Sequence, residues 1–97
     1  MASETARVPT ANGSKYLQQL CKHWSHKLDV EFTPEKGVVR FPEAVATMTA
    51  GADVLMVTVS ADREEEVERM KDVVAKHLDR FAFREAPLPF EWAKDQA

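Results

Sequence analysis

The sequence predicts an α+β fold, a two-layer sandwich in which two helices pack on one face of an antiparallel sheet. Two stretches, residues 15–27 and 62–81, carry apolar residues at helical spacing. Four shorter stretches between them alternate apolar and polar residues and are separated by short turns. A chain of 97 residues, 44% of them hydrophobic, can bury one core, so we expect residues 1–97 to form a single domain.

The N-terminal part predicts a strand followed by a helix. Residues 5–10 are typical of a short edge strand, where Pro9 removes no needed hydrogen bond. Asn12, Gly13 and Ser14 suit a turn with a helix N-cap. The helix expected over residues 15–27 presents one apolar stripe, made of Tyr16, Leu17, Leu20, Cys21, Trp24 and Leu28.

The middle of the chain predicts four strands in an antiparallel meander. They cover residues 29–33, 37–41, 44–50 and 53–61. Turn residues such as Pro34 and Gly51 separate the members of each pair. In the fourth strand Leu55, Val57 and Val59 face one side. The other side also carries apolar residues, which favours a central position or a covered face.

The C-terminal part predicts a second helix and a last strand. Asp62 and Glu65 fit a capping box at the helix start. The apolar stripe of this helix is Val67, Met70, Val74, Leu78 and Phe81. Pro87 and Pro89 prevent its continuation, and residues 90–93 suit a strand with Phe90 and Trp92 on one face. The predicted order is β-α-β-β-β-β-α-β.

Charge and composition exclude several classes of protein. The net charge of -3 provides no basic field for nucleic acid or for an anionic membrane. No apolar run approaches the roughly 20 residues of a membrane-spanning helix, and the start of the chain lacks the pattern of a signal peptide. One cysteine cannot form an intramolecular disulfide. We therefore expect a cytoplasmic protein without nucleic-acid or membrane partners.

Catalytic motifs are not visible in the sequence. The three glycines all fall in expected turns, so no phosphate-binding loop, dinucleotide fingerprint or nucleophile elbow is present. His77 could act with Asp79 or Glu85 as an acid-base pair, although the spacing does not select that pairing. An enzyme is thus the weakest hypothesis, and we expect no cofactor. We also expect no metal site, because Cys21 lies far round its helix from His23 and His26 and is better explained as a buried apolar residue.

A cluster of histidines and arginines at the edges of the two helical stripes is the candidate site. His23 lies at the edge of the first stripe with His26 beyond it, and His77 lies at the edge of the second. Arg80 and Arg84 continue the same side of the second helix if it extends that far. Facing edges would form a groove that binds an anion or a carboxylate. Alternatively, the arginines pair with Asp79, Glu85 or a helix C-terminus, and His77 bonds a backbone carbonyl.

Two segments resemble the signatures of a known family. Residues 16–27 (YLQQLCKHWSHK) and 77–85 (HLDRFAFRE) are similar in sequence, spacing and position to the bacterial family called domain of unknown function 2218. The resemblance implies a small α+β protein without an established activity. Some members are fused to flavin-dependent siderophore-interacting reductases, which implies a link to iron and siderophore metabolism. Both signatures centre on polar residues of the candidate site: His23, His26, His77, Arg80, Arg84 and Glu85.

Two functional hypotheses follow. The first is a small anionic ligand bound in the His/Arg groove between the helices. The second is an interaction module whose free sheet face, with Met48, Val54 and Met56, binds a second copy of the chain or a reductase. The element order also resembles one half of the TATA-binding-protein-like fold, an architectural analogy that carries no function. The acidic balance argues against a DNA-binding saddle.

Overall fold

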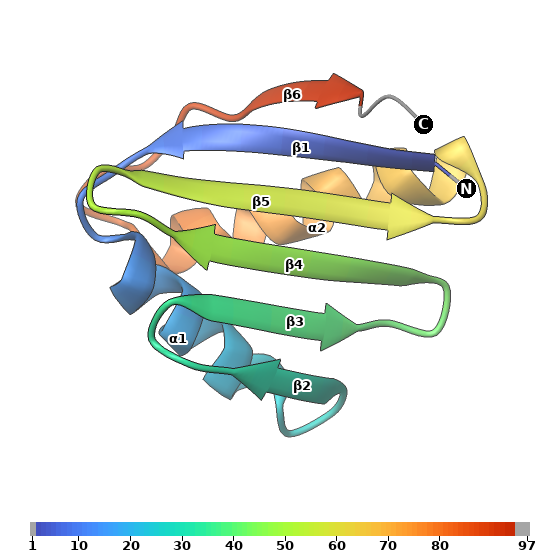
Figure 1. Ribbon diagram of the computed structural model, residues 1–97, viewed down its shortest axis with the longest axis horizontal. Helices are drawn as coiled ribbons and strands as arrows, with labels where there is room; N and C mark the ends of the chain where they lie inside the picture. The colour runs from blue at the N-terminus through green and yellow to red at the C-terminus, as the bar shows by residue number, and fades with distance from the viewer. Residues whose placement is uncertain (1, 95–97) are drawn as a thin grey trace.

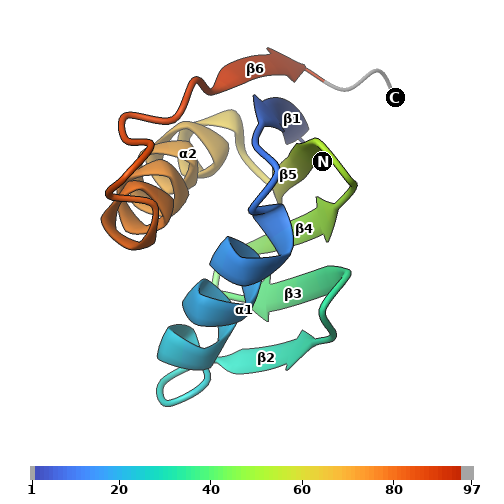
Figure 2. The same cartoon turned by 90° about the vertical axis from the view of Figure 1, so that its left-hand side faces the viewer.

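The computed structural model describes residues 2–94 and has one antiparallel sheet of six strands with two helices on one of its faces (Figures 1 and 2). The elements in chain order are β1 (Ala2–Pro9), α1 (Gly13–Trp24), β2 (Asp29–Phe32), β3 (Lys36–Arg40), β4 (Ala44–Ala50), β5 (Val54–Ala61), α2 (Glu64–Phe81) and β6 (Glu91–Lys94). The strands lie side by side in the order β2-β3-β4-β5-β1-β6. The predicted fold class and element order are confirmed.

The first strand lies inside the sheet rather than at its edge. β1 pairs with β5 along its whole length and with β6 from Glu4 to Arg7. The predicted edge position is therefore wrong, because β6 adds a strand outside β1. Pro9 is still tolerated, since it lies beyond the stretch that pairs with β6.

The core lies between the sheet and the helices. Alternate residues of the central strands point inward, and both helical stripes pack against them. The fully buried large side chains include Leu17, Leu20, Met48, Leu55, Val57, Val74 and Leu78. Burying each such side chain contributes about 1.5–3 kcal/mol.

Cys21 belongs to this core, as its place in the apolar stripe predicts. It is 0% exposed, and burial raises the pKa of its thiol to about 11. Gly37 of β3 lies directly beneath it, where an added Cβ would come within 2.6 Å of Cys21 Sγ. The sheet can approach α1 closely at this point because Gly37 has no side chain.

Two details of the helices differ from the predictions. α1 ends at Trp24, so His26 lies in the turn that follows. The capping box at Asp62 and Glu65 is wrong, because α2 begins at Glu64 with Arg63 at the N-cap position and without a side-chain cap hydrogen bond. Three glutamates in its first turn instead suit the positive end of the helix dipole.

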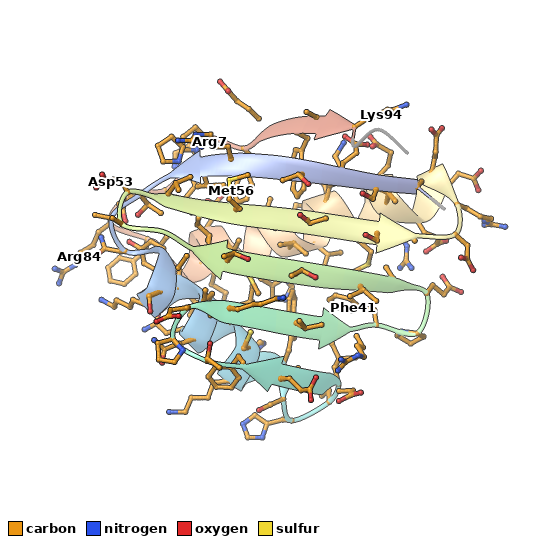
Figure 3. All side chains as sticks on the ribbon, viewed as in Figure 1. Arg7, Phe41, Asp53, Met56, Arg84 and Lys94 are labelled. Carbon is orange, nitrogen blue, oxygen red and sulfur yellow. The ribbon has the colours of Figure 1, made fainter. Side chains whose placement is uncertain are left out.

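The outer face of the sheet is not covered by either helix (Figure 2). Its centre is rich in threonine, and Thr5 and Thr58 hydrogen-bond across β1 and β5 through their hydroxyls at 2.9 Å. Met56 lies on this face (Figure 3), whereas Met48 points into the core and is 0% exposed. The inclusion of Met48 in the free face is therefore wrong.

Within residues 2–94, neither helix has the length and apolar character needed to cross a bilayer.

Candidate functional site

The ends of the two helices meet in a cluster of rings. His23 and Trp24 come from the last turn of α1, His77 and Phe81 from the last turns of α2, and Phe41 directly follows β3. Ring centres are 4.9 Å apart for Trp24 and His77, 5.1 Å for Trp24 and Phe41, and 5.8 Å for His23 and Phe81. The two imidazoles are 6.0 Å apart. We refer to these five residues as the ring cluster.

A pocket of about 610 Å³ lies along α2, next to this cluster. It is lined by Phe41, Pro42, Glu43, Ala44, Glu66, Arg69, Met70 and Val73. We call it the α2 pocket. Phe41 belongs to both the pocket and the ring cluster, and Val73 stands one turn before His77 on α2. The pocket and the ring cluster therefore adjoin along α2, and we refer to the two together as the groove.

The charged rim of the α2 pocket is an ion-pair network. Arg69 Nη2 lies 2.6 Å from Glu66 Oε2 and 3.3 Å from Glu43 Oε2. The hydrogen bond from Arg69 lowers the pKa of Glu66, and the same bond raises the pKa of Arg69. Because one guanidinium is shared by two carboxylates, this end of the groove does not favour an additional anion.

His77 is held by the backbone of its own helix. Its Nδ1 lies 2.7 Å from the carbonyl oxygen of Val73. A carbonyl only accepts hydrogen bonds, so Nδ1 is the donor, and in the neutral ring Nε2 keeps its lone pair. The bond to a backbone carbonyl that the sequence allows for His77 is therefore observed, and it does not exclude a ligand at Nε2.

The other predicted site residues do not join the ring cluster. His26 is exposed beyond the end of α1. Arg84 lies past the end of α2, with its guanidinium 5.8 Å from the exposed ring of Phe83, and extends away from the molecule (Figure 3). Arg80, exposed and within one turn of His77, has no carboxylate partner at ion-pair distance among residues 2–94. The convergence that the sequence suggested is thus limited to His23 and His77, with Arg80 nearby on α2.

Glu85 belongs to a different cluster, at the start of α1. Its carboxylate accepts hydrogen bonds from Thr10 Oγ1 at 3.0 Å, from Asn12 Nδ2 at 3.2 Å and from the hydroxyl of Tyr16. The bond from Tyr16, followed by that from Asn12, lowers the pKa of Glu85, and the same contact raises the pKa of Tyr16. Tyr16 and His23 are separated by about 10 Å along α1. Glu85 therefore fastens the segment after α2 to the beginning of α1.

A second polar cluster on the inner face of the sheet was not predicted. Glu4 is only 7% exposed, and its Oε1 lies 3.0 Å from Lys71 Nζ of α2. Lys71 also pairs with Glu68 at 2.7 Å and lies 5.7 Å from the centre of the Trp92 ring. Partial burial lowers the pKa of Lys71, but the hydrogen bonds to Glu68 and Glu4 outweigh this effect, so the pKa is raised overall. The cluster ties α2 to β1 and β6.

Within the described part of the chain, no three His, Cys, Asp or Glu side chains are arranged to hold a metal ion together.

Comparison with known proteins identifies uncharacterised relatives. Residues 5–93 match a family described as "Uncharacterized protein conserved in bacteria (DUF2218)". The NMR structure of PA4090 from Pseudomonas aeruginosa is 34% identical in sequence and has a TM-score of 0.78, with 100% of this chain and 98% of that chain covered. A search of curated proteins gave no match. The solved relative has the same fold, and neither finding assigns an activity.

Proposed function

The chain belongs to the uncharacterised bacterial DUF2218 family, and from this premise we propose that it binds a small molecule in the groove along α2. The observation that carries the proposal is the α2 pocket of about 610 Å³, which opens beside the ring cluster. Small-molecule sites have volumes of about 300–1,000 Å³ and mostly apolar walls with a few polar groups. Phe41, Met70 and Val73 supply such walls.

The charges along the groove indicate the class of ligand. The apolar body of the ligand would lie in the α2 pocket, against Met70 and Val73. Its anionic group would lie toward Arg80, whose guanidinium is unpaired among residues 2–94, whereas Arg69 is already shared by two carboxylates. Val73 and Arg80 are about 10 Å apart along α2, which is the length of a two-ring molecule. The ligand is therefore an amphipathic anion.

Binding fits this groove better than acid-base catalysis. The carbonyl of Val73 orients the His77 ring and leaves Nε2 available, as a catalytic histidine also requires. Within residues 2–94, however, no carboxylate is paired with this ring to raise its basicity. The link of some family members to siderophore-interacting reductases makes anionic iron chelators a first set of compounds to screen.

The proposal can be tested with 1-anilinonaphthalene-8-sulfonate, which has an aromatic body and one sulfonate. We expect one molecule to bind to the folded chain, with increased fluorescence. Val73→Trp should block binding because the indole fills the pocket while the backbone carbonyl that holds His77 remains. Arg80→Ala should weaken binding, and Arg84→Ala is the matched control. If both Val73→Trp and Arg80→Ala bind the probe as the wild type does, the groove is not the site.

The uncovered outer face of the sheet favours a second candidate function, self-association. Val45 on this face is 37% exposed, and Val54 and Met56 lie on the neighbouring strand. A second copy of the chain could cover these side chains. Sedimentation velocity over a range of concentrations should then show a dimer, which Val45→Glu would dissociate. A wild-type protein that stays monomeric throughout would contradict this candidate.

A further inference from the structure

Two imidazoles from different helices lie close together in the ring cluster. The rings of His23 and His77 are 6.0 Å apart between centres, and their planes are inclined by 41°. With metal–nitrogen distances of about 2.0 Å, two histidines on one ion have ring centres about 5 Å apart at a tetrahedral angle and about 6 Å apart when trans. The observed separation is within this range.

The orientation of His77 is already suited to a metal ligand. Metal-bound histidines commonly donate their second ring nitrogen to a carbonyl or a carboxylate, which fixes the tautomer and the ring plane. The bond from His77 Nδ1 to the carbonyl of Val73 does this at 2.7 Å. The lone pair of Nε2 remains available. His23 is exposed, so its side chain can rotate to complete a pair.

From these contacts we propose that His23 and His77 bind one divalent transition-metal ion that bridges α1 and α2. Water completes the coordination, since within residues 2–94 no third His, Cys, Asp or Glu joins them. Cys21 is excluded because it is fully buried in the core between α1 and the sheet. Imidazole with water suits Ni²⁺, Zn²⁺ and Cu²⁺ rather than Mg²⁺ or Ca²⁺. This inference does not rest on the proposed organic ligand.

The bridge would act on stability as well as on binding. An ion held by both helices binds the folded chain more tightly than the unfolded chain, so it raises the melting temperature, and the rise grows with the logarithm of the free ion concentration above the Kd. Trp24, whose ring centre is 4.9 Å from that of His77, should also sense a paramagnetic ion through quenching of its fluorescence.

The test is calorimetric titration of the tag-free chain with NiCl₂ in a non-chelating buffer. We expect one site, with His23→Ala and His77→Ala each weakening binding by at least about tenfold. His26→Ala is the matched control, because it removes the third histidine of the chain and should leave the affinity unchanged. His23 is exposed, so His23→Ala should fold normally, which circular dichroism verifies.

A second measurement separates the bridge from surface binding. In the Trp92→Phe background the remaining tryptophan is Trp24. Ni²⁺ should quench its fluorescence and raise the melting temperature, and His23→Ala should abolish both effects. Val73→Trp should retain Ni²⁺ binding, so failure of the organic-ligand proposal is distinguishable from failure of this one. Any of three results would overturn the inference. The wild type does not bind Ni²⁺, His23→Ala binds it as tightly as the wild type, or His26→Ala loses binding.

Discussion

Replacing Gly37 by alanine should destabilise the fold through a single contact with Cys21. An added Cβ would lie 2.6 Å from Cys21 Sγ, against 3.4–4 Å for ordinary contact. The sulfur atom or β3 would thus have to move by roughly 0.8 Å in a close-packed core. Leu17 Cδ1 and Phe32 Cβ, at 3.5 and 3.6 Å, leave no free space beside the new methyl group.

The magnitude follows from two opposing effects. Overpacking of a core costs about 1–3 kcal/mol. Gly37 does not have a positive φ, so alanine is conformationally allowed and should by itself stabilise the chain by about 0.4–1 kcal/mol. We expect a net loss of about 1–2 kcal/mol in the free energy of unfolding, which corresponds to a decrease of roughly 4–16 °C in melting temperature.

A double-mutant cycle with Cys21→Ala isolates the contact. Urea unfolding followed by tryptophan fluorescence gives the free energy of unfolding for the wild type, both single variants and the double variant. In the Cys21→Ala background the sulfur is gone, so Gly37→Ala should become neutral or stabilising. If Gly37→Ala costs as much in that background as in the wild type, the explanation by steric contact is refuted.

Three further predictions concern buried or hydrogen-bonded polar groups. The hydrogen bond from Tyr16 is the main reason that the pKa of Glu85 is lowered in the folded chain. The contribution of Glu85 to stability is therefore present above its unfolded pKa and is lost as the pH falls through its folded pKa. In Glu85→Gln the free energy of unfolding should change less with pH over that interval. Lys71→Ala should cost about 1–3 kcal/mol in urea unfolding because Glu4 is left buried without its partner, and Lys71→Met with Glu4→Leu should recover most of the loss. Cys21 should react with a thiol reagent only as fast as the chain opens, and a reaction at the rate of free cysteine would contradict its burial.

The fold was predictable where one face of an element is clearly more apolar than the other. Both helical stripes and the pairing of the four central strands were predicted on this basis. β4 was harder because its inward residues Ala44 and Ala46 are no more apolar than the outward Val45, so the pattern does not decide which face Met48 occupies. The place of β1 depends on pairing with β6, a contact between the two ends of the sequence that local patterns do not reveal.

The candidate site was predicted in part for a similar reason. His23 and His77 lie at stripe edges within the helices, so helical geometry correctly brings them together. The same geometry fails for His26 and Arg84, because the helices end at Trp24 and Phe81. Glu85 was grouped with the histidines by its position in the sequence. Its partners come from residues 10–16, about seventy positions away, and no local pattern connects them.

The central position of β1 has a consequence for synthesis on the ribosome. β1 is translated before the rest of the sheet, and its neighbours β5 and β6 begin more than forty and more than eighty residues after β1 ends. The hairpins from β2 to β5 use local contacts and can form while the chain is still growing. β1 completes its hydrogen bonds only when β6 arrives, so the finished sheet forms after β6 has been translated. Removal of β6 would leave β1 as an exposed edge over Glu4 to Arg7, with backbone groups able to pair with another molecule and nucleate aggregation.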